Sequence, residues 1–158
     1  MLRCTARLLS PLRVSRPAVG EASADDWYAN LLWLERRKCL LLTHAGTLFS
    51  VFVPDVAVAG LRPPGPFVVN ALRRALRAEG LPSTALGDLD ENAVTVAKTV
   101  DRRVVGTMND HAALVEHLVA TAGGLAGCDQ VAVNHQLHRT INSLTGYTPP
   151  LELVTSRQ

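Results

Sequence analysis

The sequence has few of the residues that stabilise secreted proteins or span membranes. It contains three cysteines, Cys4, Cys39 and Cys128, which are far apart and form no Cys-x-x-Cys pair. An odd number of scattered thiols excludes a disulfide framework and a zinc ribbon, and is typical of reduced thiols in a cytoplasmic protein. No apolar run approaches the roughly 18 residues that a membrane span needs. The sequence therefore predicts a soluble, cytoplasmic protein.

Aromatic side chains and an excess of one charge are also scarce. Aromatic residues make up 4% of the chain, and 16 basic against 14 acidic residues leave a formal net charge of +2. Such a weak overall field disfavours a protein that coats nucleic acid, but it leaves room for a local basic patch. With 158 residues, 47% of them hydrophobic, the chain has the size and apolar content of one folded domain.

The sequence motifs of common enzymes are absent. There is no Gly-x-Ser-x-Gly elbow and no Walker loop, and the glycines of residues 123–127 follow a predicted helix instead of joining a strand to one. His135 and His138 lie three residues apart on a predicted helix, a spacing that can place two imidazoles on one metal ion. No glutamate completes a His-Glu-x-x-His set. We therefore predict no catalytic residue, no metal and no cofactor.

Hydrophobic periodicity divides the chain into strands and helices. Apolar and β-branched runs predict strands at residues 1–5, 27–35, 38–43, 47–53 and 93–99, and helical spacing predicts helices at 67–79, 107–122 and 129–144. Prolines and glycines leave residues 10–25 as a surface connection and 148–158 as a short tail. This order predicts a single α+β domain over residues 1–158, with an antiparallel meander sheet of about four to five strands covered on one face by about three helices.

Four local expectations accompany this fold. Residues 1–5 are predicted as an edge strand, although the arginine-rich, acid-free residues 1–20 also suit a transit peptide. The connection at residues 35–38 lacks the glycine of a tight hairpin, so its register stays open. We expect Gly46 to take positive φ in the next turn. Thr107 and Asp110 have the spacing of a helix-capping box.

The strongest candidate for binding is the run Arg36, Arg37 and Lys38. Three adjacent cations repel one another and favour exposure to solvent or to an anion. The preceding predicted strand contributes three aromatic residues, Trp27, Tyr28 and Trp33. Aromatic rings interleaved with arginine are typical of single-strand nucleic-acid platforms, whereas a solvated turn and a buried aromatic core are the simpler interpretation.

A second candidate lies between a predicted strand and a helix start. It comprises Lys98, Asp101, Arg102, Asn109 and Asp110. Backbone amides at a helix N-terminus favour an anion, which Arg102 could share. The alternative is an ordinary capping network, because asparagine and aspartate at a helix start need no further cause.

Several short strings resemble one protein family when they are taken together. In chain order they are Arg3-Cys4-Thr5, Trp27 with Asn30-Leu31, Arg36-Arg37-Lys38-Cys39-Leu40, Thr47 with Ser50, Lys98-Thr99 through Arg102 and Gly106, and Met108-Asn109-Asp110. They resemble the bacterial domain of unknown function 6933, up to about Asp110 and more loosely to Pro149. The resemblance implies a small soluble bacterial protein and supplies no reaction. The chain departs from the family pattern at His44 and His138, where asparagine is usual, and at Arg103, where serine is usual.

These observations favour a noncatalytic binding or accessory module. Its basic surface would comprise Arg36, Arg37, Lys38, Lys98, Arg102, Asn109 and Asp110, and its partner would be nucleic acid or an acidic protein. The alternative is a small metal-assisted hydrolase or nuclease that uses Asp101, Asn109 and Asp110 with a histidine. A third alternative is a structural subunit that self-associates through the apolar meander as a homo-oligomer.

Overall fold

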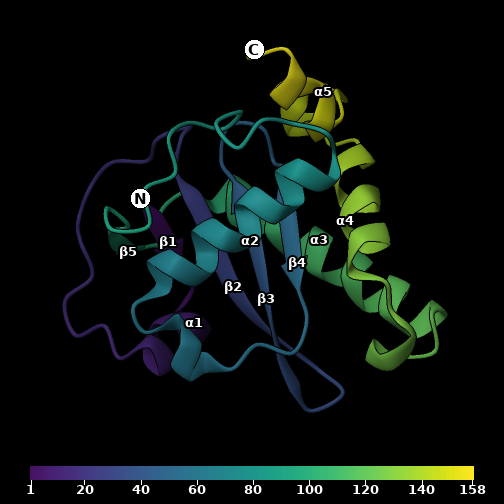
Figure 1. Ribbon diagram of the computed structural model, residues 1–158. Helices are drawn as coiled ribbons and strands as arrows, with labels where there is room; N and C mark the ends of the chain where they lie inside the picture. The colour runs from purple at the N-terminus through teal and green to yellow at the C-terminus, as the bar shows by residue number, and fades with distance from the viewer.

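A single five-stranded sheet forms the centre of the computed structural model, which describes residues 1–158 (Figure 1). The strands are β1 (Leu2–Cys4), β2 (Trp27–Leu34), β3 (Arg37–His44), β4 (Ser50–Val53) and β5 (Val96–Lys98). They lie in the order β4-β3-β2-β1-β5. The predicted α+β class and the β2–β3–β4 antiparallel meander are confirmed.

The first strand lies inside the sheet, not at its edge. β1 runs parallel to both β2 and β5, with Leu2 opposite Trp27 on one side and Val96 on the other. All three residues of β1 are buried. The sheet is therefore mixed and not wholly antiparallel, because helical connections precede β2 and follow β4.

Helices cover both faces of the sheet, whereas the sequence predicted cover on one face. Helices α1 (Ala6–Leu12) and α2 (Pro64–Ala78) pack on the face that carries Leu40 and Leu42. Helices α3 (Arg102–Thr121) and α4 (Gln130–Arg139) pack on the face that carries Leu41 and Phe52. β3 is apolar at consecutive positions because both of its faces are buried.

The predicted helices exist, but three of their ends differ, and α2 begins at Pro64 instead of residue 67. α3 begins at Arg102 because Asp101 caps it, its carboxylate accepting a hydrogen bond from the Arg103 amide at 2.9 Å. The capping box predicted at Thr107 is therefore wrong, since Thr107 is buried inside the helix. α4 ends at Arg139, and a short 3₁₀ turn at Ser143–Thr145 follows it.

Two short helices that the sequence did not predict extend into the segments predicted as irregular. α1 includes Pro11, and α5 (Pro150–Thr155) begins at a proline, which suits the first helical turn because the missing amide hydrogen is not needed there. Val154 of α5 is fully buried against the core on the α1 and α2 side. None of the helices combines the length and the apolar character needed to cross a membrane.

In the turn between β3 and β4, Gly46 does not have the positive φ that was predicted. The residue with positive φ is Leu48, at 57°, and not Gly46. A Cβ at Gly46 would lie 2.7 Å from the carbonyl oxygen of Ala24. Glycine is required here because the segment before β2 passes so closely.

Candidate functional site

The run Arg36, Arg37 and Lys38 lies at the exposed end of the β2–β3 hairpin, which extends beyond α1 and α2 in Figure 1. We call residues 33–38 the hairpin tip. Glu35 and Arg36 form a two-residue turn with φ of 49° and 64°, so β2 and β3 pair without a bulge. The Glu35 carboxylate accepts a hydrogen bond from the Leu125 amide at 3.0 Å, which ties the turn to the 3₁₀ turn Leu125–Gly127. The length of the turn fixes the register that the sequence left open, with Leu34 opposite Arg37.

The charges of the hairpin tip are only partly compensated. Arg37 pairs with Asp55 at 2.7 Å, but both side chains are more than half exposed, so the pair contributes little stability. Lys38 lies opposite Trp33, with its ammonium 5.3 Å from the ring centroid. Arg36 is exposed and makes no ion pair. The tip therefore presents Arg36 and Lys38 to solvent as unpaired cations.

The aromatic platform expected beside these cations reduces to one ring. Trp27 and Tyr28 are buried, at 6% and 0% exposure, and Trp33 is 59% exposed. The Tyr28 hydroxyl accepts a hydrogen bond from the Asp101 amide at 3.1 Å. Tyr28 thus supports the start of α3, and Trp33 is the aromatic residue available to a partner.

The second candidate set surrounds the N-terminus of α3. Arg102 and Asn109 line a shallow hollow of about 350 Å³, and Lys98 and Asp110 are exposed but do not line it. Asp101 is engaged as the cap, and its hydrogen bonds from Arg103 hold the pKa of its carboxyl below the usual range. The ordinary capping alternative accounts for Asp101.

The two candidate sets do not form one surface. α3 has 20 residues and is therefore about 30 Å long. Arg102 lies at its first residue, whereas the hairpin tip contacts the turn that follows its last residue. The structure also does not bring Asp101, Asn109 and Asp110 together with a histidine, because the neighbouring His111 is buried and bonded to Ser50 at 2.8 Å.

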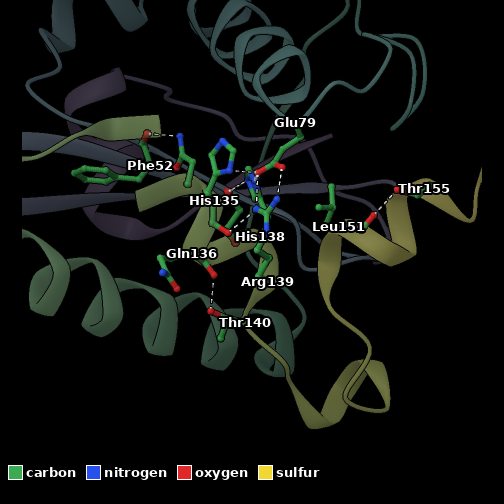
Figure 2. A network of polar contacts seen from close by, with 11 residues as sticks. Phe52, Glu79, His135, Gln136, His138, Arg139, Thr140, Leu151 and Thr155 are labelled. Carbon is green, nitrogen blue, oxygen red and sulfur yellow. Dashed lines mark hydrogen bonds and ion pairs between the residues drawn. The ribbon is translucent and has the colours of Figure 1, made fainter. Parts of the chain in front are cut away.

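A third cluster, which sequence reasoning did not identify, joins the end of α2 to α4. Figure 2 shows Glu79 reaching toward three residues of α4, His135, His138 and Arg139. One carboxylate oxygen lies 2.7 Å from His138 Nδ1, and the other accepts from Arg139 at 2.9 Å. Burial alone would raise the pKa of Glu79, but the hydrogen bonds from Arg139 and His138 outweigh it and lower that pKa.

His138 has a structural role in this cluster. Its ring stacks on Phe49 with centroids 3.8 Å apart, and its Nε2 lies 2.8 Å from the Ser50 carbonyl oxygen. Both ring nitrogens therefore lie against oxygen atoms of the protein, so neither is free to bind the metal that the His135–His138 spacing could accept. No group of three histidine, cysteine or carboxylate side chains has an arrangement that could hold a metal ion.

Another residue of α4 closes the exposed edge of the sheet. Asn134 accepts a hydrogen bond from the Phe52 amide at 2.7 Å and donates one to the Phe52 carbonyl at 3.3 Å. Its side-chain amide thus pairs with β4 as a neighbouring strand would. This contact leaves a groove beside it, between α2 and α4, of about 450 Å³.

The comparisons with known proteins agree with the resemblance read from the sequence. No curated protein and no solved structure matches the chain. A family model described as "Domain of unknown function (DUF6933)" matches residues 1–153, so the match covers every strand and the first part of α5. The chain belongs to this family of domains of unknown function, DUF6933.

Proposed function

We propose that this protein is a noncatalytic binding module that takes single-stranded nucleic acid at the hairpin tip. The observation that carries the proposal is the exposure of Trp33, 59%, on a projecting hairpin with the Lys38 ammonium 5.3 Å from its ring. Tryptophan is rarely left in water without a partner, because its large apolar surface favours burial. A base can stack on such a ring whatever its identity.

The charges around Trp33 suit a phosphate backbone. Asp55 compensates Arg37, and Glu35 is held by the Leu125 amide, so Arg36 and Lys38 remain to contact phosphates. Arg36 adopts a left-handed conformation that a residue with a Cβ takes only at a cost in free energy. Backbone strain of this kind is found most often at functional sites, and here the strained turn directs the Arg36 side chain into solvent.

The geometry of the other predicted site residues supports a noncatalytic function. Asp101 caps α3, and His111 is buried against the sheet, so neither can act with Asn109 or Asp110 on a substrate. Lys98 and Arg102 lie near the opposite end of α3 from the hairpin tip. We therefore expect the tip to bind its partner without them.

Fluorescence anisotropy with a labelled oligothymidine tests this proposal across a range of salt concentrations. Stacking on an aromatic residue contributes about 1–3 kcal/mol per base, so Trp33→Ala should weaken binding by roughly five-fold to 150-fold. Removing two phosphate contacts with Arg36→Ala and Lys38→Ala should reduce the slope of log K against log salt by about 1.4. Arg102→Ala is the matched control and should bind like the wild type.

Two outcomes would refute the proposal. One is equal loss of affinity in the Arg102→Ala control and in the tip variants, and the other is no binding of the oligonucleotide at low salt. If polyglutamate binds as tightly as the oligonucleotide, and Trp33→Ala does not weaken it, the partner is an acidic protein. If native mass spectrometry shows a dimer that Trp33→Ala abolishes, the partner is a second copy of the chain.

We also propose a cytoplasmic location, which the state of the thiols supports. Cys4, Cys39 and Cys128 are all free, and Cys4 and Cys39 are buried. Free thiols are typical of a reducing compartment such as the cytoplasm.

A further inference from the structure

The groove between α2 and α4 combines apolar walls with an unpaired cation. Its volume is about 450 Å³, and Val53, Phe67 and Val131 form part of its apolar lining. Asn70 and Arg74 of α2 face Gln130 and His135 of α4 across it. A cavity of this size with a few convergent polar groups is typical of a small-molecule site.

Arg74 is the cation that gives the groove its charge. It makes no ion pair and no side-chain hydrogen bond, whereas Arg73, the residue before it, donates to the Leu89 carbonyl at 2.7 Å. Asn70 precedes Arg74 by one helical turn and lies on the same face of α2. An arginine without a carboxylate partner in a partly apolar groove favours an anion.

The one carboxylate that lines the groove, Glu79, does not neutralise Arg74. The side chain of Glu79 is 2% exposed, and its two oxygens are occupied by Arg139 and His138. Its charge is therefore compensated from within the protein. His135 Nδ1 faces Glu79 at 3.5 Å, which leaves Nε2 as the nitrogen available to a ligand.

We propose that the α2–α4 groove is a second binding site, for a small amphipathic anion whose carboxylate or phosphate group contacts Arg74 and His135. The apolar part of the ligand lies against Phe67, Val53 and Val131. None of these residues belongs to the hairpin tip, so this site is independent of the nucleic-acid proposal. Glu79 positions His135 and does not itself contact the ligand.

Isothermal titration of the full chain with four probes tests this site. Octanoate and octyl phosphate share an apolar chain with octanol and octylamine but differ from them in charge. We expect the two anions to bind and the amine not to bind, and the ratio of the two anion affinities shows whether carboxylate or phosphate is preferred. Arg74→Gln should weaken the preferred anion about ten-fold or more.

Arg77→Gln is the matched control, because Arg77 lies on the same helix and does not line the groove. It should leave anion affinity unchanged, and Arg74→Gln should leave oligonucleotide binding unchanged. Equal binding of octanoate and octylamine, equal loss in the two arginine variants, or no binding of either anion would each overturn the proposal. Circular dichroism verifies that both variants are folded, which both exposed positions allow.

Discussion

Replacement of Arg36 by glycine should stabilise the protein while weakening binding at the hairpin tip. Arg36 has φ of 64° and is the second of two residues in the left-handed region of the β2–β3 turn. That conformation costs a residue with a Cβ about 1–2 kcal/mol. Glycine adopts it freely but loses about 0.5–1 kcal/mol more conformational entropy on folding. The difference predicts a net gain of roughly 0.5–1 kcal/mol, or about 2–3 °C in Tm for a domain of this size.

Urea unfolding monitored by circular dichroism measures this gain against two controls. Arg36→Ala keeps the Cβ and therefore the strain, so its free energy of unfolding should stay within about 0.5 kcal/mol of the wild type. Arg37→Gly makes the same chemical change one residue later, in the regular strand β3. Glycine loses more conformational entropy than arginine when it is fixed at the start of a strand, and the exposed Arg37–Asp55 pair is also lost, so Arg37→Gly should destabilise the protein by about 0.5–1 kcal/mol.

The reasoning fails if Arg36→Gly is no more stable than Arg36→Ala, because the turn would then store no backbone strain. It also fails in its functional part if Arg36→Gly binds the oligonucleotide as tightly as the wild type. A variant that gains stability and loses affinity is the expected result. That combination distinguishes a residue kept for binding from one kept for folding.

Three further predictions concern the buried groups. Burial lowers the pKa of His44 and of His111 from 6.5 to about 4, so the unfolded chain binds more protons between these values. The stabilisation of the folded state by these neutral histidines is complete above about pH 6.5 and is lost as the pH falls toward 4. At about pH 5 the loss is roughly 2 kcal/mol per histidine. Urea unfolding midpoints measured at about pH 7.5 and about pH 5 should therefore differ. An unchanged midpoint would contradict this account. Glu79→Gln should lower the free energy of unfolding by about 2–4 kcal/mol, because it leaves His138 without its buried carboxylate. Arg139→Gln should lower it by less than about 1 kcal/mol, because the Arg139 side chain is 49% exposed. Thermal melts that rank the two variants in the reverse order would disprove the assignment. Val154→Ala should cost about 2 kcal/mol if α5 anchors the C-terminal segment to the core, and a loss below about 0.5 kcal/mol would show that it does not.

The sequence predicted the elements whose apolar pattern is local. The stripe Val68, Leu72, Ala75 and Leu76 is buried as helical spacing indicates, and Gly80 ends α2 with φ of 72°. The runs in β2 and β3 predicted the meander, because apolar residues at consecutive positions are typical of buried strands. The cations of the hairpin tip were also found from the sequence, since their adjacency excludes burial.

Other features depend on residues far apart in the chain. Trp27, Tyr28 and Trp33 look alike in the sequence. Only the packing of helices on both faces of the sheet and the reach of the hairpin decide that Trp33 alone is exposed. Glu79 precedes Arg139 by 60 residues, so nothing local indicates their bidentate pair. The same holds for the α2–α4 groove, whose two walls come from separate helices.

The sequence by itself determined the α+β class, the meander, the main helices and the location of the exposed basic run, because periodicity and charge repulsion act between near neighbours. Only the tertiary structure decided that β1 lies between β2 and β5, that both faces of the sheet are covered and that Arg102 lies far from Arg36. It also decided which titratable groups share a cavity. Those outcomes depend on burying apolar surface over the whole chain, which local sequence patterns do not record.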